Sequence, residues 1–196
     1  MARKPSLPSA PPLDEEQLKA VTIGTRVPLN STIELVAYDS EWPKLYAKLE
    51  GLVRAALGSN AVLIEHVGST SVPGLSAKPI IDMILAVEDS ADENAYVPQL
   101  EKQGFRLHIR EPDWFEHRLL KAPNISGNLH VFSAGCEEMD RMLLFRDWLR
   151  AHDEERALYE RTKKELASRV WQYTQHYADA KADVVRAILS RAIEAH

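Results

Sequence analysis

The sequence predicts an α+β fold of the mixed α/β kind, because strand-like and helix-like segments follow one another without a regular alternation. Strand patterns, rich in β-branched and apolar residues, dominate the chain up to residue 133. Helical periodicity takes over from residue 137 onward. A doubly wound parallel sheet would need repeated strand–helix–strand units, and no such repeat is visible.

Composition limits the classes of function. The chain of 196 residues is 45% hydrophobic and 27% charged, which is typical of a globular domain with a buried core. Its 24 Lys and Arg against 29 Asp and Glu give a net charge of −5, which argues against bulk nucleic-acid binding. The single cysteine, Cys136, excludes a disulfide within the chain. No apolar run approaches the roughly 18–20 residues of a membrane-spanning helix. We expect a cytoplasmic protein without membrane contact.

The first 30 residues are predicted to be a flexible lead-in. Residues 1–12 are rich in Pro and Ser, a composition that disfavours regular structure. A short helix is expected around residues 14–20. The domain proper is then expected to span residues 31–196, of which 137–196 form a helical part.

Six segments have the composition of β-strands. The segment 79–87 is almost continuously apolar apart from Asp82, which is typical of a strand covered on both faces of a sheet. The remaining segments are shorter or mix polar and apolar residues more evenly. The predicted strands span residues 33–38, 61–67, 79–87, 105–109, 114–121 and 129–133.

Helical periodicity marks five further segments. The first has an apolar face, with Ser40 as its expected N-cap and Gly58 as its stop. In the C-terminal helices charges of both signs are interleaved, as on solvated helix faces, and this charged region is compatible with a homodimer. The predicted helices span residues 42–57, 92–103, 137–152, 153–169 and 178–195.

The stretch 65–84 carries the most chemical information. A predicted strand turns at Gly68, and three consecutive hydroxyl residues follow, Ser69, Thr70 and Ser71. Glycine lets a backbone approach a ligand closely, and turn amides with hydroxyls bind phosphate oxygens. Lys78 adds a positive charge nearby. The pattern predicts a phosphate-binding loop, although the Walker A sequence is absent. An ordinary tight turn is the alternative.

Asp82 lies inside the apolar segment that follows this loop. A buried carboxylate is costly unless it has a partner, and Mg²⁺ is a suitable one. A phosphate loop with a strand carboxylate is what metal-assisted phosphoryl or nucleotidyl transfer requires. A structural aspartate that accepts hydrogen bonds from loop amides is the alternative interpretation.

Four motifs together resemble the GrpB (UPF0157) family over roughly residues 30–195. They are EHVGSTSVPGL at 65–75, KPIID at 78–82, NLHV at 128–131 and LFRDWLR at 144–150. The resemblance implies a nucleotidyltransferase-like fold, a mixed sheet flanked by helices. In that superfamily a Gly-Ser loop holds a nucleoside triphosphate, and a following Asp-x-Asp/Glu pair binds divalent metal.

This resemblance maps Gly68, Ser69 and Asp82 onto the superfamily pattern, but the second carboxylate position holds Ile84. Either another residue supplies the ligand, or one metal suffices, or the site only binds. We expect Glu116, on a neighbouring predicted strand, to be the substitute. Asp82 and Glu116 are thus the expected catalytic and metal-binding residues.

Alternation along the predicted strand 114–121 assigns side chains to faces. Glu116 and Arg118 share one face, so Arg118 is expected to bind phosphate, and His117 points to the other face. Three further residues are pocket candidates, although a lone histidine on a strand is more often a satisfied core residue. They are His66, His130 and Arg146.

Two functions from different classes follow. In the first, a nucleotidyltransferase-like enzyme binds a nucleoside triphosphate with Mg²⁺ and transfers a nucleotidyl group to an unknown acceptor. In the second, the domain is a non-catalytic binding or chaperone-like accessory module for a phosphorylated metabolite or a protein partner. Ile84 and the occurrence of this family fused to dephospho-CoA kinase favour the second. A transferase based on Ser, His and Arg groups ranks last, because no nucleophile-elbow motif is present.

Overall fold

A computed structural model describes residues 6–7, 14–26 and 28–195, so the predicted lead-in at 1–5 and 8–13 lies outside the described residues. The described residues contain one mixed five-stranded sheet in the order β1-β2-β5-β4-β3. Strands β2 and β5 are parallel, and all other neighbours are antiparallel. The predicted α+β class is therefore confirmed. The strands are β1 (Leu63–Val67), β2 (Ile81–Val87), β3 (Arg106–Glu111), β4 (His117–Lys121) and β5 (Gly127–Ser133).

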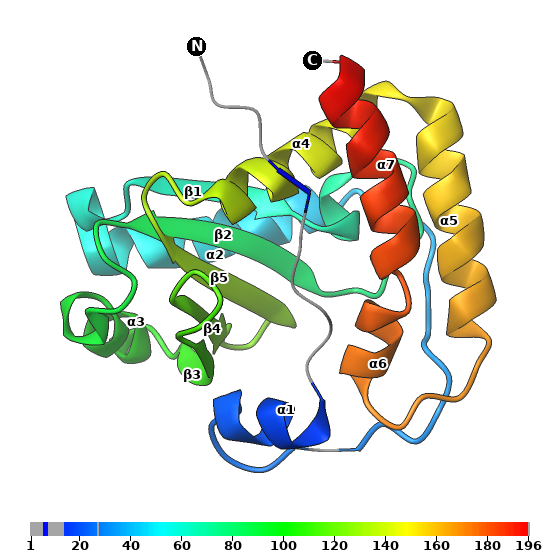
Figure 1. Cartoon of the computed structure of the whole chain (residues 1–196). Helices are drawn as coiled ribbons and strands as arrows, with labels where there is room; N and C mark the ends of the chain where they lie inside the picture. Colours follow the sequence, from blue (N-terminus) through cyan, green and yellow to red (C-terminus); the bar gives the residue numbers. More distant parts are fainter. Residues whose placement is uncertain (1–5, 8–13, 27, 196) are drawn as a thin grey trace.

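Helices cover both faces of this sheet. Figure 1 shows α4 lying across one face with α7 and α5 beside it, while α2 lies on the other face. The predicted short N-terminal helix is present as α1, capped by the side chain of Asp14. The helices are α1 (Glu15–Val21), α2 (Trp42–Leu57), α3 (Val97–Lys102), α4 (Glu137–Ala151), α5 (Asp153–Ala167), α6 (Thr174–Asp179) and α7 (Ala182–Ala195).

The two faces of the sheet differ in composition. Met83 and Leu85 of β2 belong to the main hydrophobic core, which α2 and α3 complete; we call this side the apolar face. Successive side chains of a strand point to opposite faces, so Asp82 and Ile84 lie on the other side. There α4 covers a smaller apolar cluster that includes Ile84, and beside it lies a cavity with mixed polar and apolar walls. We call this second side the pocket face.

Two local expectations are wrong. Residues 33–38 form no strand, because their pairing is limited to one isolated bridge between Val36 and Ala77 in a loop. Ser40 is not the N-cap of α2; Glu41 takes that position, and its backbone N–H donates to the Asp39 carboxylate. The predicted helix 178–195 is present as α7, which begins at Ala182, while residues 178–179 end the preceding helix α6.

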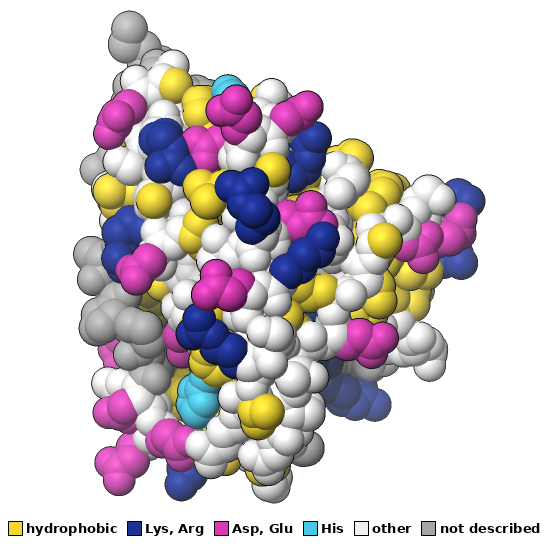
Figure 2. All heavy atoms as spheres, turned by 90° about the vertical axis from the view of Figure 1, so that its right-hand side faces the viewer, with side chains coloured by type: hydrophobic (Ala, Val, Ile, Leu, Met, Phe, Trp, Pro, Cys, Tyr) yellow, Lys and Arg dark blue, Asp and Glu magenta, His cyan; other side chains and the backbone are white. Residues whose placement is uncertain are grey.

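The outer surface over the C-terminal helices matches the interleaved charges of the sequence. Figure 2 shows Lys and Arg side chains mixed with Asp and Glu on this side of the molecule. Arg191 of α7 pairs with Glu155 of α5, and Lys164 pairs with Glu160 within α5. Within the described residues, no helix combines the length and apolar composition needed to cross a bilayer.

Candidate functional site

A cavity of about 640 Å³ opens on the pocket face of the sheet. Its floor carries Asp82 from β2, Asn128 and His130 from β5, and Lys121 from β4. Three of these residues lie side by side across the sheet, since Asn128 is the register partner of both Asp82 and Lys121. The cavity therefore gathers polar side chains from three adjacent strands.

The turn after β1 forms one wall and approaches Asp82 closely. Gly68 has φ +69° and ψ −175°, a combination essentially restricted to glycine. A Cβ at Gly68 would lie 2.7 Å from Asp82 Oδ2. The hydroxyl of Ser71 donates to the Gly68 carbonyl at 2.6 Å, and that of Thr70 donates to the Ile80 carbonyl at 3.1 Å. The phosphate loop and the strand carboxylate of the sequence thus lie side by side.

Lysines from four parts of the chain line this cavity: Lys78, Lys121, Lys163 and Lys181. Lys163 of α5 is only 1% exposed and donates to Ser69 Oγ at 3.0 Å and to the Ser76 carbonyl. Burial, with a smaller effect of the Lys181 charge, lowers the pKa of Lys163 to about 7. Burial also lowers the pKa of each of the other three lysines. Low-dielectric surroundings disfavour these charges unless an anion joins them.

Asp82 is the sole carboxylate that lines the cavity within the part of the chain described. Asn128 Nδ2 donates to its Oδ1 at 2.7 Å, and His130 Nε2 is 4.0 Å from the same oxygen. Burial raises the pKa of Asp82, while the hydrogen bond from Asn128 and three nearby lysines oppose that rise. Asp82 is therefore a half-buried carboxylate whose charge is partly compensated.

These donors do not fit a divalent cation held by the protein alone. Mg²⁺ prefers several oxygen ligands, whereas the cavity offers one carboxylate that already accepts a hydrogen bond. The surrounding lysines would repel the ion. Ile84 is fully buried in the apolar cluster beneath α4 and supplies no ligand. Across the described residues, no group of three His, Cys, Asp or Glu side chains could hold a metal.

Glu116 and Arg118 are not brought to Asp82. The expected strand at 114–116 is a turn, in which Phe115 and Glu116 have φ of 55° and 51°. Arg118 shares the apolar face with Leu120, and its guanidinium binds Glu93 at 2.6 Å and Glu116 at 3.3 Å. The pair does belong together, as alternation predicted, but it lies away from the cavity.

His66, Ser71 and Arg146 also do not line the cavity. His66 stacks on Tyr46 of α2 with ring centroids 4.8 Å apart, on the apolar side of β1. Arg146 of α4 binds Glu65 at 2.7 Å and donates to the His66 carbonyl at 2.9 Å. The Arg146 contacts attach α4 to β1. Of the predicted candidates, the cavity contains Gly68, Ser69, Thr70, Lys78, Asp82 and His130.

Sequence reasoning missed Lys121, Lys163, Lys181 and Asn128. A usable signal existed for Lys163, because Tyr159, Lys163 and Leu166 are spaced four and three residues apart on α5 and all three are buried. A lysine on the buried stripe of a helix needs a partner or a function. The charged character of the segment instead suggested a solvated face.

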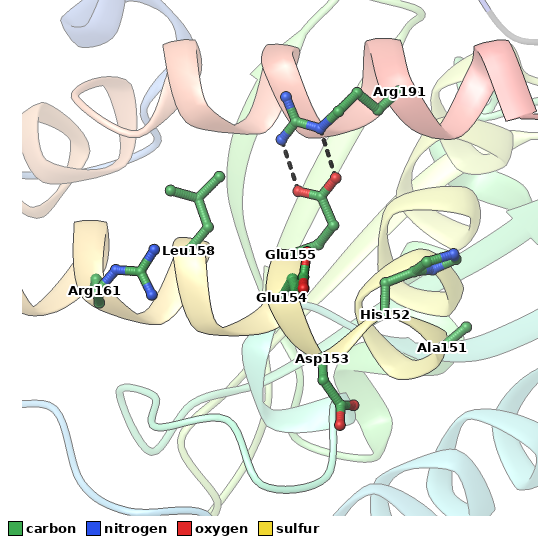
Figure 3. Close-up of a pocket in the computed structure, with 8 residues that line it drawn as sticks. All are labelled: Ala151, His152, Asp153, Glu154, Glu155, Leu158, Arg161 and Arg191. Atoms are coloured by element: carbon green, nitrogen blue, oxygen red, sulfur yellow. Dashed lines mark hydrogen bonds and ion pairs between the residues drawn. The ribbon is translucent and has the colours of Figure 1, made fainter.

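A second cavity of about 680 Å³ lies between α5 and α7 (Figure 3). Glu155 and Arg191 form a two-pronged ion pair across it, with N–O distances of 2.5 and 2.7 Å. Its charged groups have both signs and are partly exposed. Because this pair neutralises itself, the second cavity lacks the surplus of positive charge found beside Asp82.

The chain is similar to known proteins over most of its length. The family model described as GrpB protein matches residues 32–191. A UPF0157 protein of Halalkalibacterium halodurans is 56% identical over 189 residues, which cover 96% of both chains. A UPF0157 protein of Streptomyces coelicolor is 41% identical over 86% of this chain and 95% of its own. The crystal structure of conserved protein GrpB from Enterococcus faecalis has a TM-score of 0.69 at 26% identity, covering 83% and 98% of the two chains.

Proposed function

This chain belongs to the GrpB family, and from that premise we propose that the cavity beside Asp82 binds a phosphorylated small molecule. The observation that carries the proposal is an excess of hydrogen-bond donors and positive charge. Four lysines and Arg26 line the cavity with a single carboxylate. In the described part of the chain, Arg26 Nη1 and Tyr177 Oη are buried there without a hydrogen-bond partner. Such groups are costly to bury unless a ligand accepts from them.

The turn at Gly68 and the amine of Lys163 supply the expected phosphate contacts. Ser69 lies between them, since its hydroxyl accepts from Lys163 at 3.0 Å. A phosphate oxygen that reaches this point gains a charge-assisted hydrogen bond and restores the charged form of Lys163. Lys181 and Lys78 can neutralise further phosphate charge.

Aromatic and apolar side chains of the same cavity suit the organic part of such a ligand. Tyr173 and Tyr177 line the cavity together with Leu18 and Leu35. The guanidinium of Arg26 lies 3.9 Å from the centre of the Tyr173 ring, and Lys181 Nζ lies 4.6 Å from that of Tyr177. A cavity of about 640 Å³ falls within the size range of small-molecule sites. Cationic groups beside aromatic rings together favour a nucleotide or a similar phosphorylated compound.

Nucleotidyl transfer is the second candidate function, and the close approach of Gly68 to Asp82 favours it. A transferred phosphate held by the turn would lie beside that carboxylate. The need for Mg²⁺ stays a prediction, because one carboxylate is a poor donor set for this ion. The two candidate functions differ in whether phosphate binding depends on the metal.

Thermal unfolding with sodium tripolyphosphate and with each common nucleoside triphosphate tests both, in Mg²⁺ and in EDTA. Ligand at 100 times its Kd should stabilise the protein by about 2.7 kcal/mol. We expect a shift of the melting temperature that persists in EDTA and is much smaller in Lys163→Met. Lys164→Met is the matched control, because Lys164 is exposed on the same helix and pairs with Glu160.

Each outcome separates the candidates. A shift that requires Mg²⁺ and is lost in Asp82→Asn would support nucleotidyl transfer over simple binding. Absence of a shift with every phosphate compound, in a folded protein, would contradict the proposed binding function.

A further inference from the structure

A row of hydrogen bonds crosses three strands on the pocket face. Glu111 at the end of β3 accepts from His117 Nδ1 of β4 at 2.6 Å. His117 Nε2 lies 3.0 Å from His130 Nδ1 of β5. The other nitrogen of His130, Nε2, faces the cavity, 4.0 Å from Asp82 Oδ1. The row thus joins a carboxylate at the sheet edge to an imidazole in the proposed ligand site.

The carboxylate at one end sets the direction of every hydrogen bond. An ionised carboxylate can only accept, so His117 Nδ1 carries a proton. With no second proton on His117, its Nε2 accepts and His130 Nδ1 donates to it. In this arrangement His130 holds its one proton on Nδ1 and has a free lone pair on Nε2. The distance of 4.0 Å to Asp82 is too long for a hydrogen bond that would change this assignment.

Packing fixes both rings in this arrangement. The side chain of His117 is 3% exposed, and its ring stacks against Phe132 with centroids 4.8 Å apart. Trp114 meets the same ring edge-on at 5.0 Å. The His117 and His130 rings are stacked at 5.2 Å. A rotation of either ring would break the row and disturb a buried aromatic cluster.

We propose that His130 Nε2 is the proton acceptor for a hydroxyl group in this cavity, and that His117 and Glu111 are positioning residues for it. The inference rests on the second candidate function, nucleotidyl transfer, because the hydroxyl belongs to an alcohol that attacks the bound phosphorylated ligand. As its oxygen bonds to phosphorus, the bond from phosphorus to the leaving oxygen breaks and that oxygen takes the electron pair. The hydroxyl proton moves to His130 Nε2.

The row of hydrogen bonds also explains how His130 can act as a base in a cavity lined by lysines. Burial, with a smaller effect of the Lys121 charge, holds the pKa of His130 well below its ordinary value, so the ring is neutral and able to accept. The charged groups near it are Asp82 on β2 and Lys121 on β4. When Nε2 takes a proton, the Nδ1 proton can pass to His117 Nε2. The positive charge then lies beside the Glu111 carboxylate, away from the lysines.

Nuclear magnetic resonance of protein with ¹⁵N-labelled histidine tests the proton positions without any ligand. In wild type we expect His130 as the Nδ1–H tautomer, with Nε2 at the resonance position of an unprotonated nitrogen. Glu111→Gln keeps a hydrogen-bond acceptor but removes the charge, so the His117 and His130 signals should shift. His108→Asn is the matched control, because His108 lines the same cavity outside the row. An Nε2–H tautomer for His130 in wild type would overturn the proposal.

The accepting power of Nε2 is measured by acylation with diethyl pyrocarbonate, followed by peptide mass spectrometry. We expect modification at His130, several-fold slower in Glu111→Gln and unchanged in His108→Asn. An equal rate at His130 in wild type and Glu111→Gln would contradict the role of the carboxylate. Protection by tripolyphosphate reports on the ligand site separately, so its failure would count against phosphate binding and leave the result for His130 intact.

Discussion

The two faces of the sheet differ in role: the apolar face stabilises the fold, and the pocket face carries the candidate site. The apolar face buries Leu49 and Val53 of α2 and Leu100 of α3 against the sheet, all essentially without solvent exposure. The pocket face carries a small apolar cluster under α4, and beside it lie lysines whose charged forms are disfavoured by burial. One face contributes folding free energy, and the other carries groups that cost free energy until a ligand binds. A site of this kind depends on the opposite face for its stability.

The largest expected effect comes from the apolar face. Leu49→Ala removes a fully buried side chain that touches the core around Gly127. Large-to-small core substitutions of this kind cost about 2–5 kcal/mol. Urea denaturation should show that loss, with tripolyphosphate binding unchanged in the folded fraction. Val62→Ala, at a side chain 59% exposed, is the control and should change little. A similar loss for both variants would argue against the division between the faces.

The next effect tests the contact between the Gly68 turn and Asp82. Gly68→Ala introduces a Cβ 2.7 Å from Asp82 Oδ2 and places alanine in a backbone region nearly restricted to glycine, at a cost of about 1–3 kcal/mol. Gly74→Ala is the control, because Gly74 also has positive φ but open space around its Cβ position. Calorimetry should show phosphate binding lost in the first variant and retained in the second. Equal binding in both would separate the turn from the ligand site.

The third effect is on pH dependence. A bound anion raises the pKa of Lys163 from about 7, so binding takes up a proton above that pH. Affinity for tripolyphosphate should therefore fall as pH rises from about 6 to about 8.5, by at most about tenfold per unit for one proton. Titration calorimetry in buffers of different ionisation enthalpy measures the proton uptake directly. Lys163→Met should show a flatter profile, which also corrects for titration of the ligand itself. Identical profiles in both proteins would exclude Lys163 as the linked group.

The same substitution also tests how Lys163 affects the stability of the ligand-free protein at different pH values. Lys163 has a lower pKa in the folded protein than in the unfolded chain, so the unfolded state binds more protons between about pH 7 and 10. Stability without ligand should rise with pH across that window in wild type. Lys163→Met should reduce this rise, to which the other three cavity lysines also contribute, while it weakens phosphate binding. Differential scanning calorimetry of both proteins over this pH range measures the difference in stability.

The smallest effect is expected for Glu116→Ala. The carboxylate is 46% exposed and is paired with Arg118 at 3.3 Å outside the cavity. Exposed pairs contribute roughly 0–1 kcal/mol, so stability should hardly change. Binding of phosphate compounds with or without Mg²⁺ should equal that of wild type. A loss of Mg²⁺-dependent binding would instead restore Glu116 as a metal ligand.

Local sequence signals determined much of this protein. Apolar periodicity located α2, and the apolar run around Asp82 located the internal strand β2. Gly68, Ser69 and Asp82 were predicted to act together because a hydroxyl-rich turn followed by a strand carboxylate suits phosphate chemistry. The resemblance to the GrpB family implied the same grouping. Such features depend on residues that lie close together in the sequence, so they can be predicted without a structure.

Tertiary structure alone decided the rest of the site. A turn over residues 112–116 replaced the expected strand start at Trp114, and this removed Glu116 from the sheet. Lys163 reached Ser69 only because α5 packs over the Gly68 turn, 94 positions away in sequence. Likewise, Glu111, His117 and His130 became one row only through the register of three strands. A shift of one residue in register would send each of these side chains to the other face, so composition and spacing could not assign them.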